Sequence, residues 1–222
     1  MIEGCKPMKV IKTVFTVSVF CLATICHESS ARIHYSREFH RLSYPEKRWV
    51  FFHPFIAKKA FRLTHQTREA AKEMANSSLL NSDENGGQAD AFRHAYWMAL
   101  LSQNISWRKA RQLGKAHEKG NYKDFKKRRI EEGTLPDSVS GMMDLFNNET
   151  GIEIGRKNKD LAKEELIRVV RDSVMAGRMK IIRKGKNGDP IDCEGNKINL
   201  QDFEHRWNIP KCLVESDFKY LR

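Results

Sequence analysis

The sequence lacks most of the short motifs by which enzymes are identified. It contains no glycine-rich phosphate loop, no C-x-x-C metal pattern, no H-E-x-x-H zinc signature and no internal repeat. No serine or cysteine lies in a recognisable nucleophile motif, which makes covalent catalysis a less favoured chemistry. A DNA- or RNA-binding protein without catalysis has only the charge in its favour, because no recognition-helix motif is present. Charge and the spacing of polar residues on the expected helices therefore carry the functional information.

Cysteine is scarce outside the N-terminal segment. Three of the five cysteines lie within the first 26 residues, which leaves Cys193 and Cys212 for the rest of the chain. Two cysteines in an exported protein pair more often than they stay free. Neither has enough neighbouring ligands in the sequence to suggest a metal site. We expect a disulfide that ties down the C-terminal tail.

The N-terminus has the pattern of a secretory signal. A short positive region at residues 8–12 precedes an apolar run from Val14 to Cys26, which is too short to span a bilayer comfortably. Small residues follow, so we expect a signal peptide over residues 1–31, cleaved after Ala31, and a periplasmic or extracellular protein. A lipoprotein with Cys26 as the lipidated residue is the second interpretation, because Ile25 replaces the small residue usually found before such a cysteine.

The chain carries an excess of positive charge. Forty lysines and arginines stand against 28 aspartates and glutamates, for a net charge of +12. This balance suits an anionic partner such as nucleic acid, phospholipid or a cell-wall polymer, although a basic surface can also be merely solvated. The basic run between Lys123 and Arg129 shows both possibilities, and we favour the solvated surface for it.

Hydrophobic periodicity predicts a mainly α fold, with a single helical domain and a small β-hairpin near the C-terminus. The hairpin is expected from the turn pair Asn187-Gly188, between residues 179–183 and 191–193. We expect a basic, extended N-terminal arm at 32–48, a helical core domain at 49–184, and the rest of the ribbon with a disulfide-tied tail at 185–222. Within the core domain, helices are expected near residues 54–74, 90–104, 106–118, 138–156 and 163–175, with a turn-rich linker at 76–88 and a loop at 120–136.

One expected helix combines chemically capable and apolar residues more densely than the others. It contains D-A-F-R-H-A-Y-W from Asp90 to Trp97. Asp90, His94 and Trp97 fall on one face because residues three and four apart are neighbours on a helix. A carboxylate four residues before an imidazole can accept its N–H and orient it as a general base or metal ligand. The alternative is a buried helix with a capping Asp90 and a His94 satisfied in the core; both remain open.

Two further expected helices add polar residues. His117 closes the apolar face of the helix that begins at Ser106, with Glu118 beside it. Asp144, Asn147 and Asn148 cluster on the helix capped by Asp137 or Ser138, and burial of these groups without partners would be costly. That cost favours a polar cavity shared with His94 and His117. On the same helix, Gly151 and Gly155 predict tight packing or a closely approaching ligand, because glycine weakens a helix interior.

Three separated blocks resemble a bacterial helical domain family. They are D-A-F-R-H-A-Y-W, A-H-E at residues 116–118, and M-D-L-F-N-N-E-T-G at residues 143–151. Members of that family occur as secreted proteins and as C-terminal modules of large polymorphic toxins, and the resemblance covers roughly residues 49–184. It implies a mostly α-helical exported or toxin-like domain with an immunity protein as partner. Some relatives carry histidine or tyrosine where this chain has Phe146, so a metal site that needs this side chain would be altered here.

A toxin-like hydrolase of an anionic envelope or phosphodiester substrate is the favoured function. In this hypothesis His94, His117 and Asp144 bind a divalent metal such as zinc, and Glu118 acts as the base. A metal-free version uses Asp90 and His94 as an orienting carboxylate and a base that acts on water. The residues assigned to substrate binding or to support of the site are Arg93, Trp97, Asn147 and Asn148.

The alternative function is a non-catalytic envelope-binding or structural module whose polar residues form a satisfied internal network. Exposure distinguishes the two. A catalytic cluster must open into a cleft, whereas a structural network is closed to solvent.

Overall fold

The computed structural model describes residues 37–130 and 134–219. The chain divides into two compact units, one up to Leu42 and one from Ser43 onward. In the first unit, residues 37–41 are helical. The predicted signal peptide at 1–31 lies outside the described residues. None of the described helices combines the length and apolarity needed to cross a membrane.

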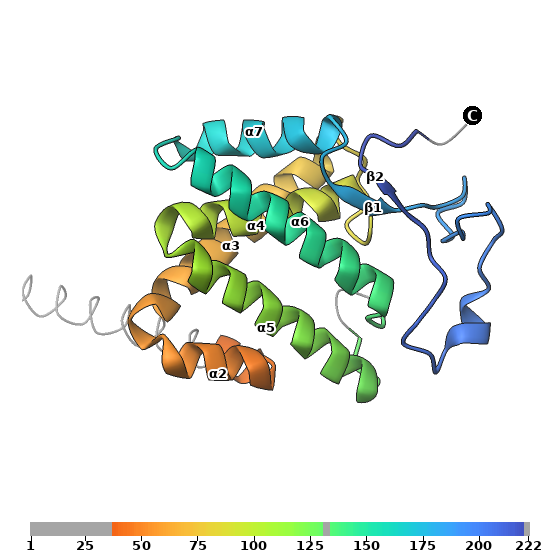
Figure 1. The fold of residues 1–222 in the computed structure, drawn as a ribbon, viewed down its shortest axis with the longest axis horizontal. Coiled ribbons are helices and arrows are strands. Elements are labelled where there is room, and N and C mark those ends of the chain that lie inside the picture. The colour runs from red at the N-terminus through yellow and green to blue at the C-terminus, as the bar shows by residue number, and fades with distance from the viewer. Residues whose placement is uncertain (1–36, 131–133, 220–222) are drawn as a thin grey trace, which may run out of the picture. The chain divides into compact units, whose positions relative to one another are not determined.

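The second unit is mainly α-helical with a small antiparallel sheet near its C-terminus, which confirms the predicted fold class. Figure 1 shows its elements around α4. In chain order they are α2 (Tyr44–Phe52), α3 (Pro54–Asn76), α4 (Gln88–Asn104), α5 (Trp107–Lys126), α6 (Ser138–Lys157), α7 (Lys163–Met175), β1 (Lys180–Ile182), a 3₁₀ turn (Leu200–Phe203) and β2 (Leu213–Glu215).

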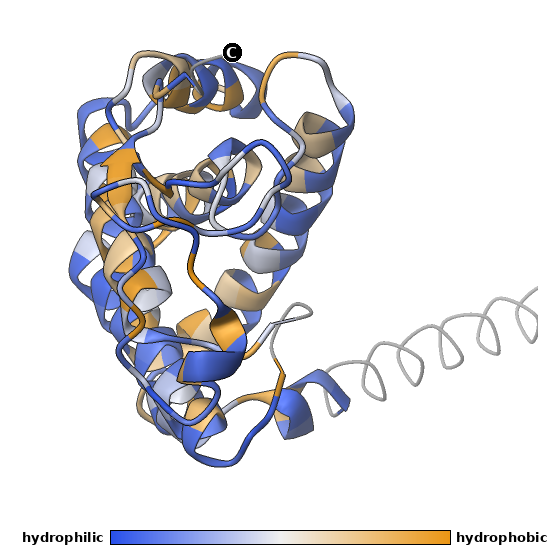
Figure 2. Ribbon diagram, turned by 90° about the vertical axis from the view of Figure 1, so that its right-hand side faces the viewer, coloured by the Kyte–Doolittle hydropathy of each residue, from blue (hydrophilic) through white to orange (hydrophobic). Residues whose placement is uncertain are grey.

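Helix α4 is the central element. Twelve of its 17 residues are buried, including Phe92, Tyr96 and Met98, so nearly every face of the helix is covered. A helix of that kind is stable only when other elements surround it. In Figure 1, α6 crosses in front of α4, with α7 above and α5 below. Figure 2 shows helices on which hydrophobic and hydrophilic stretches alternate along the length, as is typical of helices with one buried face.

The contact between α4 and α6 explains the two glycines of α6. A Cβ at Gly151 would lie 2.2 Å from the Ala95 carbonyl oxygen, and one at Gly155 would lie 2.3 Å from that of Ala99. From Gly151 to Gly155 along α6, the contacted residue on α4 moves from Ala95 to Ala99. The two helices therefore run in the same direction where they touch. The tight packing predicted from the glycine spacing is thus a backbone-to-backbone contact.

Replacement of Gly151 or Gly155 by alanine is expected to lower the free energy of unfolding by about 2–4 kcal/mol. The added methyl forces the helices apart, and this exceeds the gain of about 1 kcal/mol in helix propensity. Urea denaturation of each variant measures the loss. Gly185→Ala is the control, because its nearest neighbours would lie 3.8 Å from the added Cβ; an equal loss there would contradict the packing argument.

Helix α2 corrects the expected extended arm. Residues 44–48 are helical because Ser43 and Glu46 form a capping box and Pro45 occupies the first turn. The Ser43 N–H donates to Glu46 Oε2 over 2.8 Å. The buried Trp49 then anchors α2, since its indole Nε1 donates to the Lys109 carbonyl of α5 over 3.1 Å.

Helix α5 also departs from expectation, because it continues to Lys126 instead of ending near Glu118. Gly120 does not end the helix. A Cβ there would lie 2.5 Å from Ser43 Oγ, so this glycine admits the start of α2. Much of the expected loop at 120–136 is therefore helical. The basic run from Lys123 to Arg129 is exposed, as favoured from the sequence, and part of it forms the end of α5.

The β-sheet has a different second strand from the one predicted. The turn at Asn187-Gly188 exists and brings Lys184 opposite Pro190, but only as an isolated bridge. Strand β1 instead pairs with β2, with Ile181 opposite Val214. The sequence between the strands loops out and returns.

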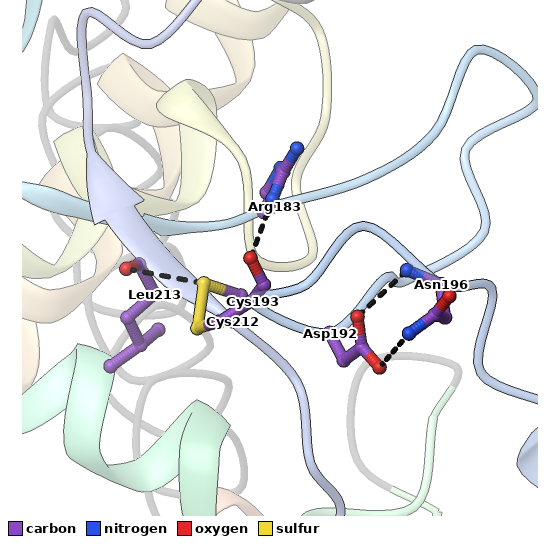
Figure 3. Close-up of a disulfide and its surroundings, with 6 residues drawn as sticks. All are labelled: Arg183, Asp192, Cys193, Asn196, Cys212 and Leu213. Carbon is purple, nitrogen blue, oxygen red and sulfur yellow. Dashed lines mark hydrogen bonds between the residues drawn. A yellow bond between two sulfur atoms is a disulfide. The ribbon is translucent and has the colours of Figure 1, made fainter.

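The predicted disulfide joins Cys193 to Cys212, directly before β2. Figure 3 shows it with Arg183, whose guanidinium donates to the Cys193 carbonyl over 3.2 Å. Next to the bridge, Lys211 Nζ lies 2.5 Å from Asp137 Oδ2, and Asp137 caps α6. The disulfide ties two parts of the C-terminal segment together. The neighbouring Lys211–Asp137 ion pair fastens that segment to the N-terminus of α6.

Candidate functional site

The N-terminal half of α4 lies against a loop that fixes its first turn. Gly86 adopts a positive φ of 85°, which lets its N–H donate to Asp90 Oδ2 over 2.7 Å. The Gly86 carbonyl accepts from Ile182 N of β1 over 2.7 Å. Asp90 Oδ1 in turn accepts from Arg93 Nη2 over 2.6 Å. A hydrogen bond to each of its two carboxylate oxygens thus holds the Asp90 side chain in place.

Three helices surround a partly open cavity of about 50 Å³. The lining includes five of the residues singled out from the sequence: Asp90, Arg93 and His94 of α4, His117 of α5 and Asp144 of α6. The other lining residues are Glu84, Asn85, Asn121, Thr134, Pro136 and Ser140. This volume admits an ion with a few water molecules.

Three side-chain atoms that can bind a metal ion lie close together at the cavity, one each from Asp90, His94 and Asp144. These three residues are called the ligand cluster below. His94 Nε2 lies 3.3 Å from Asp144 Oδ1 and 3.5 Å from Asp90 Oδ1. One donor atom from each of the three residues lies within 4.8 Å of the others, and all three side chains are buried. Within the described part of the chain, three of these buried atoms have no hydrogen bond: both ring nitrogens of His94 and Oδ1 of Asp144. The predicted Asp90–His94 hydrogen bond is therefore not formed.

Burial shifts both titrating groups toward their neutral forms. It lowers the pKa of His94 well below the usual 6.5; Arg93 and His117 lower it further, and only the Asn148 side chain opposes them. Burial likewise raises the pKa of Asp144 well above 3.8, and the carboxylates of Asp90 and Glu118 raise it further against Arg93 and His117. A neutral imidazole is the form that binds a metal or accepts a proton. The buried Asp144 carboxylate requires a proton or a cation.

His117 has a partner that the sequence did not reveal. Its Nδ1 lies 3.1 Å from Glu46 Oε1 of α2, and its ring lies edge-on to Trp97 at 5.6 Å. The rings of His94 and His117 are 6.4 Å apart. His117 therefore lines the cavity, but Glu46 holds it, and it does not join the Asp90–His94–Asp144 cluster. The S-x-x-E pattern at residues 43–46 could have located Glu46 on a helix, though not beside His117.

The remaining predicted residues have other partners. Glu118 is buried, accepts from Asn121 Nδ2 over 3.2 Å, and is not among the residues that line the cavity. Trp97 donates to Thr64 Oγ1 over 2.9 Å. The amide of Asn147 bonds both the N–H and the carbonyl of Lys180, so Asn147 holds β1 against α6.

Asn148 and Phe146 differ sharply in burial. Asn148 is 3 % exposed, and neither amide atom has a hydrogen bond among the described residues. The Asn148 side chain lies close enough to His94 to raise the pKa of that histidine against the effect of burial. Phe146 is 44 % exposed under the Lys180 ammonium and does not line the cavity. The variable position at Phe146 is thus separate from the ligand cluster.

The Glu46–His117 pair predicts an acid-dependent loss of stability. Burial alone would raise the pKa of Glu46, but the hydrogen bond and charge of His117, with the bonds from Ser43, lower it to about 2. Because the folded pKa lies below the unfolded one, the pair stabilises the protein above pH 4.5, and this contribution is lost as the pH falls toward 2. The shift corresponds to at most about 3 kcal/mol.

The Glu46→Gln variant is expected to be less stable at pH 6, with a smaller difference at pH 3. Glutamine keeps the capping box, so the change isolates the charge. Urea denaturation at both pH values measures it. Glu153→Gln is the control, because that carboxylate is exposed and 3.9 Å from Lys157. A pH-independent difference for Glu46→Gln would contradict the pairing.

The chain matches the family model described as a domain of unknown function, DUF6973, over residues 47–178. This span is more than half of the sequence, so the chain belongs to that family. No curated protein and no solved structure matches the chain. The matched span begins within α2 and ends two residues before β1, and it includes Asp90, His94 and Asp144.

Proposed function

We propose that this member of the DUF6973 family is an exported, toxin-like hydrolase of an anionic substrate, with a divalent cation held by Asp90, His94 and Asp144. One observation carries the proposal. Three buried donors lie together in an open-sided cavity, and two of them lack hydrogen bonds among the described residues. Such atoms cost free energy unless a ligand satisfies them.

The same observation weighs against a purely structural network. A network that fixes helix register satisfies its buried polar atoms, as Asn147 does with Lys180. His94 and Asp144 do the opposite, since they face one another at 3.3 Å without a hydrogen bond. Their separation suits two ligands of one ion. Ligands about 2.0–2.2 Å from a tetrahedral metal are about 3.3–3.6 Å apart.

Charge also supports a cation. The protein is strongly basic, but the cavity is lined by Glu84, Asp90 and Asp144 with Arg93 as the one arginine or lysine among the described lining residues. An anionic substrate would be repelled by those carboxylates. A divalent ion neutralises them and offers a positive centre, and zinc or manganese suits this nitrogen and oxygen donor set.

The proposed ligand set replaces His117 of the sequence-based hypothesis by Asp90. When bound, such an ion lowers the pKa of a coordinated water to about 7. Arg93 lies at the cavity with its guanidinium partly exposed and bonded to Asp90, so it is placed to bind an anionic group. Glu118 remains the proposed base only if substrate binding brings its carboxylate to the cavity. His117, fixed by Glu46, contributes positive charge when protonated.

Export is part of the proposal. The N-terminal pattern predicts a signal peptide, and a disulfide between Cys193 and Cys212 suits an oxidising compartment. The anionic substrates within reach are phospholipid, cell-wall polymer and, for a delivered toxin, nucleic acid. An immunity protein in the producing cell is the proposed partner.

Growth of a bacterial host tests the function. Residues 32–222 are expressed with and without a periplasmic leader, beside His94→Ala and the control His205→Ala, whose histidine is exposed and bonded to Arg128. Growth inhibition only with the leader, abolished by a folded His94→Ala, supports an envelope-directed enzyme. Inhibition only without it redirects the search to nucleic acid. Inhibition that survives His94→Ala, or none in either compartment, contradicts the catalytic proposal.

A further inference from the structure

Three phenylalanines stand exposed at the corner between α2 and α3. Phe51 is 76 % exposed, Phe52 62 % and Phe55 98 %. Full burial of one such side chain is worth about 1.5–3 kcal/mol. The Phe51 and Phe52 rings lie edge-on at 5.3 Å, and Phe55 follows in the first turn of α3, so this corner exposes three costly aromatic side chains. This aromatic corner lies in the second unit, at the end of α2 and the start of α3, and it is far from the ligand cluster in sequence.

The aromatic corner is rigidly presented. The capping box at Ser43 and the buried Trp49 fix α2 on α5. The corner residue His53 lies 2.8 Å from the Trp49 carbonyl through its Nδ1, and its ring packs on the Trp49 indole at 4.8 Å. Pro54 then starts α3. The three phenylalanines thus project from a stiff turn and not from a fraying helix end.

Positively charged residues flank the aromatic corner along the chain. No aspartate or glutamate occurs between residues 47 and 68, whereas five lysines and arginines lie between residues 47 and 62. Three of these side chains are exposed, those of Arg48, Lys58 and Arg62. The Arg48 guanidinium lies over the Phe52 ring at 5.8 Å. The preceding Glu46 is turned inward to His117. The patch is therefore both aromatic and cationic.

We infer that this corner docks the protein on an anionic lipid membrane, with Phe51, Phe52 and Phe55 inserted among the lipids and the flanking cations on the headgroups. Phenylalanine is one of the apolar residues that interfacial segments bury at the boundary of headgroups and acyl chains, and each lysine or arginine near an anionic surface adds attraction. Charge complementarity selects the lipid surface over a second copy of this chain, because two copies would bring the same positive charges together. The inference stands independently of the hydrolase proposal.

The test places a fluorescent reporter at the corner itself. Phe55→Trp in the full chain is mixed with vesicles of phosphatidylglycerol and phosphatidylcholine that carry bromine on the acyl chains, which quenches nearby indoles. Met175→Trp is the matched control, since Met175 is 51 % exposed at the end of α7, which lies opposite α2 in Figure 1. We expect quenching for Phe55→Trp at least threefold greater than for Met175→Trp, each measured relative to the unmodified chain.

Charge dependence completes the test. Quenching at position 55 should fall at least threefold in pure phosphatidylcholine vesicles, and also when Arg48, Lys58 and Arg62 are replaced by glutamine in the Phe55→Trp chain. Equal quenching at positions 55 and 175, or equal quenching in neutral vesicles, would overturn the inference. So would a blue-shifted Phe55→Trp emission without lipid, which would mean that another part of the chain or a second copy covers the corner.

Discussion

Replacement of His94 by alanine is expected to weaken zinc or manganese binding by at least about a hundredfold, whereas His117→Ala should weaken it by less than about tenfold. The structure separates the two histidines. His94 Nε2 faces both carboxylates at 3.3 and 3.5 Å, while His117 is held by Glu46. Loss of a direct ligand removes a metal bond, and loss of a residue hydrogen-bonded to a ligand typically costs 10- to 100-fold. His117 bonds Glu46 and not a proposed ligand, so its loss should cost less than either.

Competition with a chromogenic chelator measures both affinities. Asp90→Asn serves as an independent test of the ligand set, because it keeps the shape of the side chain and removes a charge. Thermal melting of each metal-free variant checks its folding. If His117→Ala costs as much as His94→Ala and Asp90→Asn costs nothing, the ligands are His94, His117 and Asp144, as the sequence alone suggested. If no variant changes metal affinity, the cluster is not a metal site.

The fold was largely predictable because helical periodicity is a local property. Residues 163–175 were predicted as a helix and form α7, and the end of α4 at Asn104 agrees with the expected one. The spacing of Gly151 and Gly155 predicted tight packing or a close ligand, and the structure shows a close contact between α6 and α4 at both glycines. These features depend on spacing along one element, which the sequence displays directly.

The errors concern events that depend on distant residues. A loop was expected to begin at residue 120, but Gly120 lies inside α5 and is needed for the approach of Ser43, 77 residues earlier. The turn at Asn187-Gly188 formed, yet β1 paired with a strand beyond the disulfide. In the site, the four-residue spacing placed Asp90 and His94 on one helix face. It did not show that Gly86 and Arg93 would donate hydrogen bonds to the Asp90 carboxylate. Side-chain partners across helices are set by packing, which no spacing rule reveals.

Replacement of Asp144 by asparagine is expected to stabilise the metal-free protein and to abolish its stabilisation by metal. Asp144 is buried beside the carboxylates of Asp90 and Glu118, and these raise its pKa together with burial. Since the folded pKa lies above the unfolded 3.8, the folded state binds the proton more tightly. Stability of the metal-free wild type should therefore fall as the pH rises above about 4, and the uncharged variant should lack this loss.

Urea denaturation at pH 7, with chelator or with excess metal, measures both effects. With chelator, Asp144→Asn should be more stable than the wild type by about 1–3 kcal/mol, because a repelled buried charge has been removed. With metal at about a hundred times its dissociation constant, the wild type should gain about 2.7 kcal/mol and the variant almost nothing. An aspartate that destabilises the metal-free protein and stabilises the metal-bound protein is explained by metal binding and not by a structural network. A variant that is less stable than the wild type in chelator would show instead that the Asp144 carboxylate is satisfied within the protein, and the structural alternative would then be favoured.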